Sequence, residues 1–263
     1  MTVAVGTMHG KAAAFAPAFA RWLDAEVRPS VDLDTDALGT FTRDVARVIS
    51  PEDAAIAKAR AASSELGTPL GLATEASYSP AFGGFGPMIH EELAVFVDLE
   101  RCVQVRQKLR TYAAVTPART VSDETDARKY LSQIGFPNQA VVAWAGGDLH
   151  KGIQDEATVL ALLRSGPVNL EPDLRAHRNP IRRRTLRRLA WILAARLLTP
   201  CRACGCPGFG LVDVERGVPC ATCGEETASV RADVFGCAAC DERVLRDRGM
   251  QVADPATCDA CNP

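Results

Sequence analysis

Four C-x-x-C pairs follow residue 200, and they constrain the fold more than any other feature of the sequence. The pairs are Cys201/Cys204, Cys220/Cys223, Cys237/Cys240 and Cys258/Cys261. Two residues between thiolates let both sulfur atoms of one turn reach a single tetrahedral ion at about 2.3 Å. The pairs therefore predict a small zinc-ribbon region with two zinc sites. Four thiolates per ion leave no open position for water, so we expect a structural role.

The spacing leaves the partnership of the pairs open. Fifteen residues separate Cys204 from Cys220 and seventeen separate Cys240 from Cys258, and both intervals fit a C-x-x-C…C-x-x-C zinc pattern. The simplest arrangement joins consecutive pairs into two ribbons, and a cross-braced arrangement is the alternative. Cys102 and Cys206 lie outside the pattern, and we expect them to be ordinary cysteines.

The composition is that of a folded protein without membrane-spanning helices. The chain has 263 residues, of which 47% are hydrophobic and 24% are charged, enough for one large core or two smaller ones. Nine of the ten cysteines lie after residue 200, which argues against a disulfide-stabilised secreted protein. No run approaches the roughly 20 apolar residues that span a bilayer. The N-terminus lacks the basic region of a signal peptide, so we expect a cytoplasmic location.

The net charge of −2 conceals three segments of different charge. Residues 1–174 hold 16 Lys and Arg against 22 acids, residues 175–200 hold eight Arg and no acid, and residues 201–263 hold six Arg against ten acids. Each zinc tetrathiolate adds a further formal −2, so the cysteine-rich tail would repel phosphates. The charge thus favours the tail as a structural cap or protein-docking module and argues against it as a nucleic-acid reader.

The segments also predict the domain organisation. Residues 1–174 alternate between β-rich runs and helical patterns, which predicts an α/β domain whose mixed sheet is flanked by helices. Residues 175–200 predict a basic connecting helix, with Asn179 as its cap and Pro180 at its first position. Residues 201–263 form the tandem zinc-ribbon region. Within the α/β domain we expect strands at 2–7, 27–33, 70–73, 93–97, 102–109, 140–145 and 168–170, helices at 11–25, 51–67, 123–134 and 155–164, and a loop at 80–87.

Basic side chains gather at the start of the connecting helix. There the free N–H groups and the helix dipole favour an anion, and an arginine can bind a phosphate through two hydrogen bonds. Arg175 or Arg178 would make such contacts. The alternative is a solvated basic face that balances two acidic neighbours. The candidate ligand-binding residues of this segment are Arg175, Arg178, Asn179 and Arg182, with His177 and Arg183 beside them.

Several motifs together resemble a known family. They run in order through the chain as Gly6-Thr7-Met8-His9-Gly10-Lys11, Asp36 with Gly39-Thr40-Phe41, Gly71-Leu72-Ala73-Thr74-Glu75-Ala76-Ser77, Asp173-Leu174-Arg175-Ala176 with Asn179-Pro180 and Arg182, Cys201-Arg202-Ala203-Cys204, Pro207-Gly208-Phe209-Gly210, Gly217-Val218-Pro219-Cys220 and Cys223-Gly224. This series resembles the bacterial domain-of-unknown-function family 6671 over nearly the whole chain. The resemblance implies relatives but no activity.

A second resemblance implies an activity. The order Thr7…Lys11, Gly39-Thr40-Phe41 and Ala54-Ala55 with Lys58-Ala59, then a strand ending in an acid, is similar to the house-cleaning nucleoside-triphosphate pyrophosphatases. In those enzymes a strand–loop–Lys and a later Thr-Phe hold phosphates, acids after a central strand hold Mg²⁺, and a Ser-His-Arg segment reads the base. The present chain has Thr74-Glu75-Ala76-Ser77 in place of a doubled Asp, and Ala176 in place of the serine before His177-Arg178.

The residues themselves support a candidate phosphate site. Lys11 at a strand-to-helix turn can meet a phosphate, and Gly10 permits close approach of the backbone to a ligand. Asp34, Asp36 and Glu75 offer oxygen ligands for Mg²⁺. We expect Lys11, Asp36, Glu75 and Arg175 to face one cleft. The predicted catalytic residues are Lys11, Asp36 and Glu75, and Thr7, His9, Gly10 and Thr40 are predicted to bind the ligand beside them.

Two functions of different classes follow. The first is binding of a phosphorylated small molecule or nucleotide in the α/β domain, with Mg²⁺-dependent phosphoanhydride hydrolysis as its boldest form. The alternative is a zinc-ribbon adaptor without catalysis, which docks a protein partner through its tail or binds nucleic acid through Arg182–Arg188. A purely structural interaction module is a third interpretation, but it leaves the α/β domain without a role.

Overall fold

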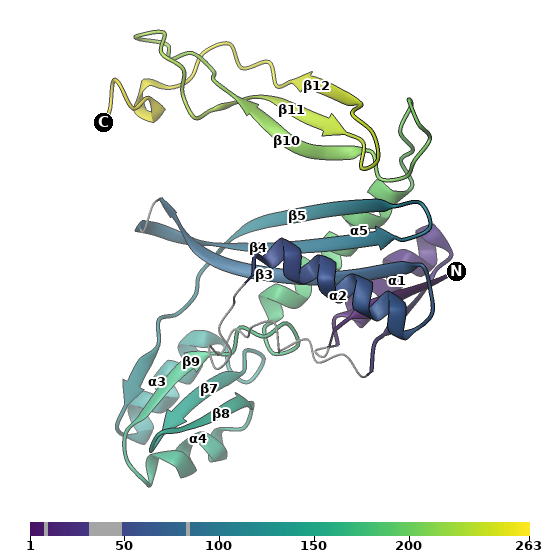
Figure 1. Ribbon diagram of the computed structural model, residues 1–263. Helices are drawn as coiled ribbons and strands as arrows, with labels where there is room; N and C mark the ends of the chain where they lie inside the picture. Colours follow the sequence, from purple (N-terminus) through teal and green to yellow (C-terminus); the bar gives the residue numbers. More distant parts are fainter. Residues whose placement is uncertain (8–9, 32–48, 83–84) are drawn as a thin grey trace.

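The computed structural model describes residues 1–7, 10–31, 49–82 and 85–263 (Figure 1). It confirms an α/β fold with a mixed sheet flanked by helices and a cysteine-rich C-terminal region. His9, Asp36 and Thr40, which the sequence places in the candidate site, lie outside the described residues. None of the helices in the described ranges is long and apolar enough to cross a membrane.

A five-stranded mixed sheet forms the larger part of the body. Its strands are β1 (Thr2–Gly6), β2 (Glu26–Pro29), β3 (Leu70–Phe82), β4 (Phe85–Asp98) and β5 (Val103–Ala113). The strand order is β2-β1-β3-β4-β5, with β2, β1 and β3 parallel and the last two strands antiparallel to their neighbours. The carboxyl ends of β1 and β2 therefore meet at one edge of the sheet, where α/β proteins commonly bind ligands.

Helices cover both faces of this sheet. Figure 1 shows α2 (Pro51–Glu65) in front and α1 (Ala12–Leu23) and α5 (Pro180–Leu197) behind. The rear helices contribute Phe15, Phe19 and Leu193 to a core that includes Leu72 and Phe96 of the sheet. The front helix is rich in alanine and lies very close to the sheet. At Gly71 an added Cβ would come within 2.1 Å of the Ala59 carbonyl oxygen, so only glycine fits there.

The strands β3 and β4 are much longer than the sequence pattern indicated. The predicted strand at 70–73 continues to Phe82, and part of the predicted loop at 80–87 belongs to these two strands. They pair continuously from Leu70 opposite Asp98 to Pro80 opposite Met88, whereas β1 ends with Gly6 opposite Ala73. The prediction failed because buried charged residues interrupt the apolar pattern. The hairpin consequently extends past the carboxyl end of β1.

A second sheet lies within the range predicted to be one α/β domain. Its order is β6-β9-β7-β8, and all its pairs are antiparallel. Tyr130, Val159 and Leu170 belong to its own core. The short, polar strands β6 and β8 were not expected from the sequence. The elements of this part are β6 (Arg119–Val121), α3 (Glu124–Ile134), β7 (Val141–Ala145), β8 (Asp148–Ile153), α4 (Glu156–Leu163) and β9 (Val168–Pro172).

The predicted connecting helix does more than connect. The side chains that α5 turns inward, among them Leu186, Leu189 and Leu193, lie in the same core as α1 and the five-stranded sheet. The helix is thus an integral part of the region built on the five-stranded sheet. The core of this region draws on residues from both sides of residue 174. The division into domains at residues 174 and 200 stays a prediction.

The tail is a three-stranded antiparallel sheet of β10 (Gly210–Arg216), β11 (Val230–Gly236) and β12 (Arg243–Asp247), followed by a short 3-10 turn (Pro255–Thr257). It lies beyond β5 (Figure 1). The buried guanidinium of Arg196 on α5 connects the tail to the five-stranded sheet. This group donates to the carbonyl oxygens of Arg106 on β5 at 2.8 Å, and of Gly208 and Leu211 in the tail at 3.0 Å each.

We expect Arg196→Met to loosen this attachment. The substitution leaves three carbonyl oxygens without their charged donor, and hydrogen bonds to charged groups are worth about 1.5–3 kcal/mol each. Urea unfolding should show a loss of at least about 2 kcal/mol, accompanied by faster proteolysis near residue 200. Arg188→Met on the exposed side of the same helix is the matched control and should change stability by less than about 0.5 kcal/mol. Equal effects of the two variants would contradict this role of Arg196.

Candidate functional site

The eight cysteines of the C-x-x-C pairs gather into two clusters. One contains Cys201, Cys204, Cys237 and Cys240, and the other contains Cys220, Cys223, Cys258 and Cys261. The sulfur atoms within each cluster lie within 4.8 Å of one another. Their closest separations are 3.5–3.8 Å. Ligands at 2.3 Å from a tetrahedral ion are about 3.8 Å apart, so both clusters fit zinc.

The clusters are cross-braced, so the simplest sequential pairing is wrong. The first C-x-x-C pair joins the third, and the second joins the fourth. The tail sheet imposes this arrangement. Because β10 and β11 are antiparallel, the residues before β10 and after β11 meet at one end of the sheet. β12 then returns the chain to the opposite end, beside the residues that follow β10. Spacing alone could not reveal this, because the strands decide which turns meet.

Tight turns shape the clusters. The N–H groups of Gly205 and Gly224 donate to the carbonyl oxygens of Cys201 and Cys220 at 2.9 and 3.0 Å, and both glycines have left-handed backbone conformations, with φ of 75° and 79°. A side chain would strain these turns. Backbone N–H groups also point at sulfur, as from Thr222 to Cys220 Sγ at 3.4 Å. Such bonds stabilise a thiolate, which is the form that binds a metal ion.

A buried ion pair occupies the rear face of the hairpin. Arg182 of α5 donates through Nε to the Glu92 carboxylate of β4 at 2.6 Å, and its Nη1 reaches the carbonyl oxygen of Leu174 at 2.7 Å. His90 Nε2 lies 3.0 Å from the same carboxylate. Burial opposes ionisation of Glu92, but Arg182 and His90 outweigh it and lower its pKa. Arg182, which the sequence placed among the ligand-binding residues, therefore makes a structural contact with a fully buried partner.

A second buried pair lies on the front face. Glu75, the predicted metal ligand, lies within β3, and its carboxylate accepts a hydrogen bond from Lys58 Nζ of α2 at 2.6 Å. A cation bound by Glu75 would have to compete with this lysine. Lys58 belongs to the motif that is similar to the pyrophosphatases, but the sequence did not predict that it is buried. Its position on a helix of alanines gave little sign that it faces the sheet.

Lys11 lies close enough to the buried ion pairs on both faces of the sheet to interact with them electrostatically. Its ammonium donates to the Thr74 carbonyl oxygen at 2.7 Å. Burial lowers the pKa of Lys11 to about 8, with Glu75 raising it and Arg182 lowering it. Thr7, at the end of β1, is buried next to this turn. At neutral pH the ammonium is mostly protonated, yet it is poorly solvated, so an anion beside it would be favoured.

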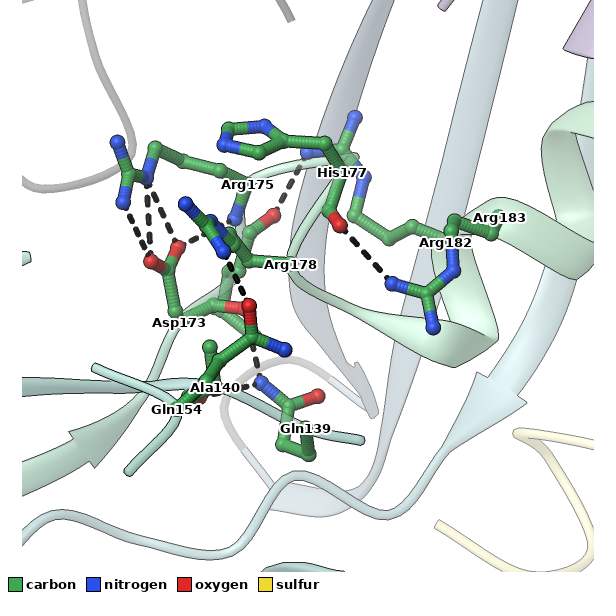
Figure 2. A network of polar contacts seen from close by, with 10 residues as sticks. Gln139, Ala140, Gln154, Asp173, Arg175, His177, Arg178, Arg182 and Arg183 are labelled. Carbon is green, nitrogen blue, oxygen red and sulfur yellow. Dashed lines mark hydrogen bonds and ion pairs between the residues drawn. The ribbon is translucent and has the colours of Figure 1, made fainter. Parts of the chain in front are cut away.

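The segment before α5 is fixed to the second sheet (Figure 2). Arg175 donates to the buried carboxylate of Asp173 at 2.7 and 3.0 Å, and Arg178 donates to Gln154. The backbone of Arg178 also accepts from the Ala140 N–H at 3.1 Å. Two of the predicted phosphate-binding arginines are thus held by protein groups near the second sheet.

The start of α5 is likewise already capped. The side chain of Asn179 accepts from the Arg182 N–H at 3.0 Å, which confirms its predicted role as a helix cap. This bond uses one of the free N–H groups on which the anion site predicted at this helix depended. The candidate anion site at α5 is therefore less available than the sequence indicated.

The basic groups that do converge surround the start of α1 instead. A cavity of about 140 Å³ lies there, between α1 and α5. Lys11 occupies the N-cap position of α1, and its side chain makes no capping hydrogen bond to the helix. Arg183 donates to the His177 carbonyl oxygen at 2.9 Å, which fixes it beside the cavity (Figure 2). The described residues that line the cavity are Gly10, Lys11, Ala13, Ala14, Ala176, His177, Arg183, Leu186 and Arg187.

The predicted cleft is thus only partly formed by the described residues. Gly10 and Lys11 lie in the cavity as expected, and Glu75 influences Lys11 electrostatically, but Arg175 does not line it. The sequence included Arg187 only in the basic stretch Arg182–Arg188 and did not place it in the phosphate site. The spacing of four residues between Arg183 and Arg187 places both on one side of α5, which was the available signal.

Comparison with protein families gives one result. The model of a family described as a domain of unknown function (DUF6671) matches residues 58–263, most of the chain. That range includes all eight clustered cysteines and the residues of α5, whereas Gly10 and Lys11 precede it. Neither the curated proteins nor the solved structures contain a match. The similarity to pyrophosphatases and the bacterial origin stay predictions.

The cross-braced pairing predicts which thiols depend on one another. Cys258→Ser combined with Cys261→Ser should reduce bound metal from two ions per chain to one and release Cys220 and Cys223 for alkylation. Mass spectrometry of alkylated peptides, with metal analysis, checks this. Release of Cys237 and Cys240 instead would restore the sequential pairing. Cys102→Ser, outside both clusters, is the control and should leave two ions bound.

The buried pair predicts a large effect of Arg182→Met on folding. Removing one partner of a buried ion pair costs about 3–5 kcal/mol, because the other charge is left uncompensated. Urea unfolding at pH 7 should show this loss, and adding Glu92→Gln should recover part of it. Arg184→Met, exposed on the same helix, is the matched control.

The sign of the pH dependence follows from the lowered pKa of Glu92. In the unmodified protein the pair stabilises the fold above the ordinary carboxyl pKa, and this contribution is lost as pH falls through the folded pKa. The stability gap between the protein and Arg182→Met should therefore narrow in acid. A gap that widens in acid would contradict this assignment.

Proposed function

The chain belongs to this family of proteins with a domain of unknown function, and we propose that it binds a phosphorylated ligand at the cavity where α1 begins. The observation that carries the proposal is the convergence of four basic side chains on that cavity. Lys11 comes from the turn after β1, His177 from the segment before α5, and Arg183 and Arg187 from α5 itself.

The local electrostatics support an anionic ligand. Residues at the start of α1 line the cavity, and the dipole of that helix adds a partial positive charge at its first turn. Lys11 makes no side-chain cap that would satisfy the first N–H groups of this helix. None of the described residues that line the cavity carries a carboxylate. Doubly charged phosphate esters suit such a site because they accept several charge-assisted hydrogen bonds.

The size of the cavity limits what it can enclose. Its volume of about 140 Å³ is well below the roughly 300–1,000 Å³ of pockets that bury a drug-sized ligand. The cavity therefore suits a phosphoryl group and not a whole nucleotide. The remainder of the ligand would lie on the surrounding surface.

Hydrolysis has weaker support than binding. A Mg²⁺ ion in such a site needs carboxylate oxygens, and Glu75 is already engaged by Lys58. The predicted Mg²⁺ site would thus depend on Asp34 and Asp36, which lie outside the described residues. We therefore propose binding as the function and leave the pyrophosphatase activity as a prediction from the sequence.

The tail has a separate role in this proposal. Both cysteine clusters are complete tetrahedral sets, so the metal ions would be structural zinc that replaces an apolar core too small to fold alone. Docking of a protein partner is a second candidate function for the tail. It is favoured by exposed apolar side chains on β10 and β12, namely Leu211, Val212, Val244 and Leu245.

Sulfate provides a direct test, because its charge stays constant between pH 6 and 10. We expect sulfate binding by titration calorimetry, with at least a five-fold loss of affinity in Lys11→Met and in Arg187→Gln. Because the pKa of Lys11 is about 8, the affinity should fall as pH rises above that value. The pH dependence should disappear in Lys11→Met.

The control for this test is Arg188→Gln. Arg188 is adjacent to Arg187 and is also exposed, but it is not among the residues that line the cavity. Arg188→Gln removes the same charge as Arg187→Gln, so the comparison separates direct contact with sulfate from general electrostatic attraction. Equal losses for Arg187→Gln and Arg188→Gln, or no measurable sulfate binding, would refute the proposed site.

A further inference from the structure

The cavity continues into a basic, aromatic surface, and we propose that the two together bind the end of a single-stranded nucleic acid that carries a terminal phosphate. This inference rests on the proposed phosphate site and names its ligand class. The surface, which we call the arginine–tryptophan face, consists of Trp22, Arg184, Arg187, Arg188 and Trp191.

The face follows from the helical period of α5. Its exposed residues recur at intervals of three and four, so they form one stripe along the helix, opposite the leucines that lie in the core. Arg184, Arg187 and Arg188 are all exposed on this stripe, and Trp191 continues it with 37% of its surface exposed. The stripe therefore offers three guanidinium groups and one indole to solvent.

Within the described parts of the chain, no acidic side chain forms an ion pair with the arginines of the face. α1 and α5 contain no acidic residue. Three neighbouring guanidinium groups on one stripe attract a polyanion, and phosphate contacts of this kind dominate affinity for nucleic acids. The acidic surroundings elsewhere in the chain would confine such a ligand to this face.

The two tryptophans give the face a preference for unpaired bases. The rings of Trp22 and Trp191 meet edge to face with their centroids 5.1 Å apart, and Trp22 keeps 42% of its surface exposed. A half-exposed pair of aromatic rings beside arginines offers a platform on which bases can stack. Bases in a duplex are already stacked and could not use it.

The cavity and the face are continuous. Arg187 belongs to both, since it lines the cavity and lies on the exposed stripe. From Arg183 at the cavity to Trp191 the helix advances eight residues, or about 12 Å. A phosphate in the cavity would thus be followed within a short distance by arginines and then by the stacking platform. This order matches a strand end, whose terminal phosphate carries an additional charge.

A membrane surface fits this face less well. The leucine side of α5 is packed against the sheet, so the helix has no apolar side to insert between lipids. A duplex could contact the arginines but would leave the tryptophans unused. We therefore propose a single strand as the ligand. Duplex DNA and anionic vesicles serve as competitors in the test.

The test measures binding of hexathymidylate by fluorescence anisotropy, with the dye at one end and a phosphate or a hydroxyl at the other. Probes with the phosphate at the 5′ end and at the 3′ end are compared. We expect one phosphorylated probe to bind at least ten-fold more tightly than its hydroxyl counterpart, and Lys11→Met to remove that difference. The logarithmic salt dependence should lose about 0.7 units of slope in Arg184→Gln and again in Arg188→Gln.

Substitution of the aromatic residues checks the platform. Trp191→Ala should reduce affinity at least five-fold, since a base–aromatic stack is worth that much or more. Trp191→Phe, which preserves packing, should lose less. Trp144→Ala on the second sheet is the matched control, because Trp144 is similarly exposed at 41% but remote from the face. Its affinity should equal that of the unmodified protein, as should that of Arg202→Gln in the tail.

The outcomes separate this inference from the proposed function. If sulfate binds in the cavity but no hexathymidylate probe binds, or if duplex DNA or anionic vesicles compete equally, the nucleic-acid inference is overturned and the phosphate site stands. If the strand binds without regard to its terminal phosphate or to Lys11, the terminal-phosphate assignment is overturned. If neither sulfate nor strand binds, both proposals fail.

Discussion

The buried ion pair between Arg182 and Glu92 constrains how α5 packs against the five-stranded sheet. It joins α5 to the part of the β3–β4 hairpin that extends past β1. If either residue lost the other, a buried charge would be left without a partner, which destabilises the fold. The same helix is capped by Asn179 beside the second sheet and clamps the tail through Arg196 at its other end. One helix thereby positions all three parts of the chain.

This arrangement explains why the candidate site lies at α1 and not at α5. The arginines nearest to the start of α5 are used to hold protein groups: Arg175 binds Asp173, and Arg182 binds Glu92. Arg183, which also donates to the carbonyl oxygen of His177, and Arg187 line the cavity together with Lys11. The paired charges give rigidity, and the proposed phosphate site uses the positive charge that lines the cavity. The division between structural and available arginines is a consequence of packing.

Much of the fold was predictable because its local signals are strong. Ser50 with Pro51, and Asn179 with Pro180, mark helix starts that the structure confirms. Parts of β3 and β4 were predicted, but their full length was not, because Glu75, His90 and Glu92 look like loop residues when their buried partners are unknown. Lys58 and Arg182 supply those partners from distant parts of the chain. A charge that is neutralised only in three dimensions cannot be recognised as buried from its neighbours in sequence.

The cysteine-rich tail shows the same division most clearly. Residue type and short spacing were enough to predict that eight cysteines form C-x-x-C turns suited to metal ions and that α5 carries a basic surface. The cross-braced pairing of the cysteine clusters depends instead on the fold, because three antiparallel strands bring alternate turns together. The burial of individual arginines also depends on the fold, because Arg182 needs the carboxylate of Glu92 and Arg196 needs carbonyl oxygens of β5 and the tail.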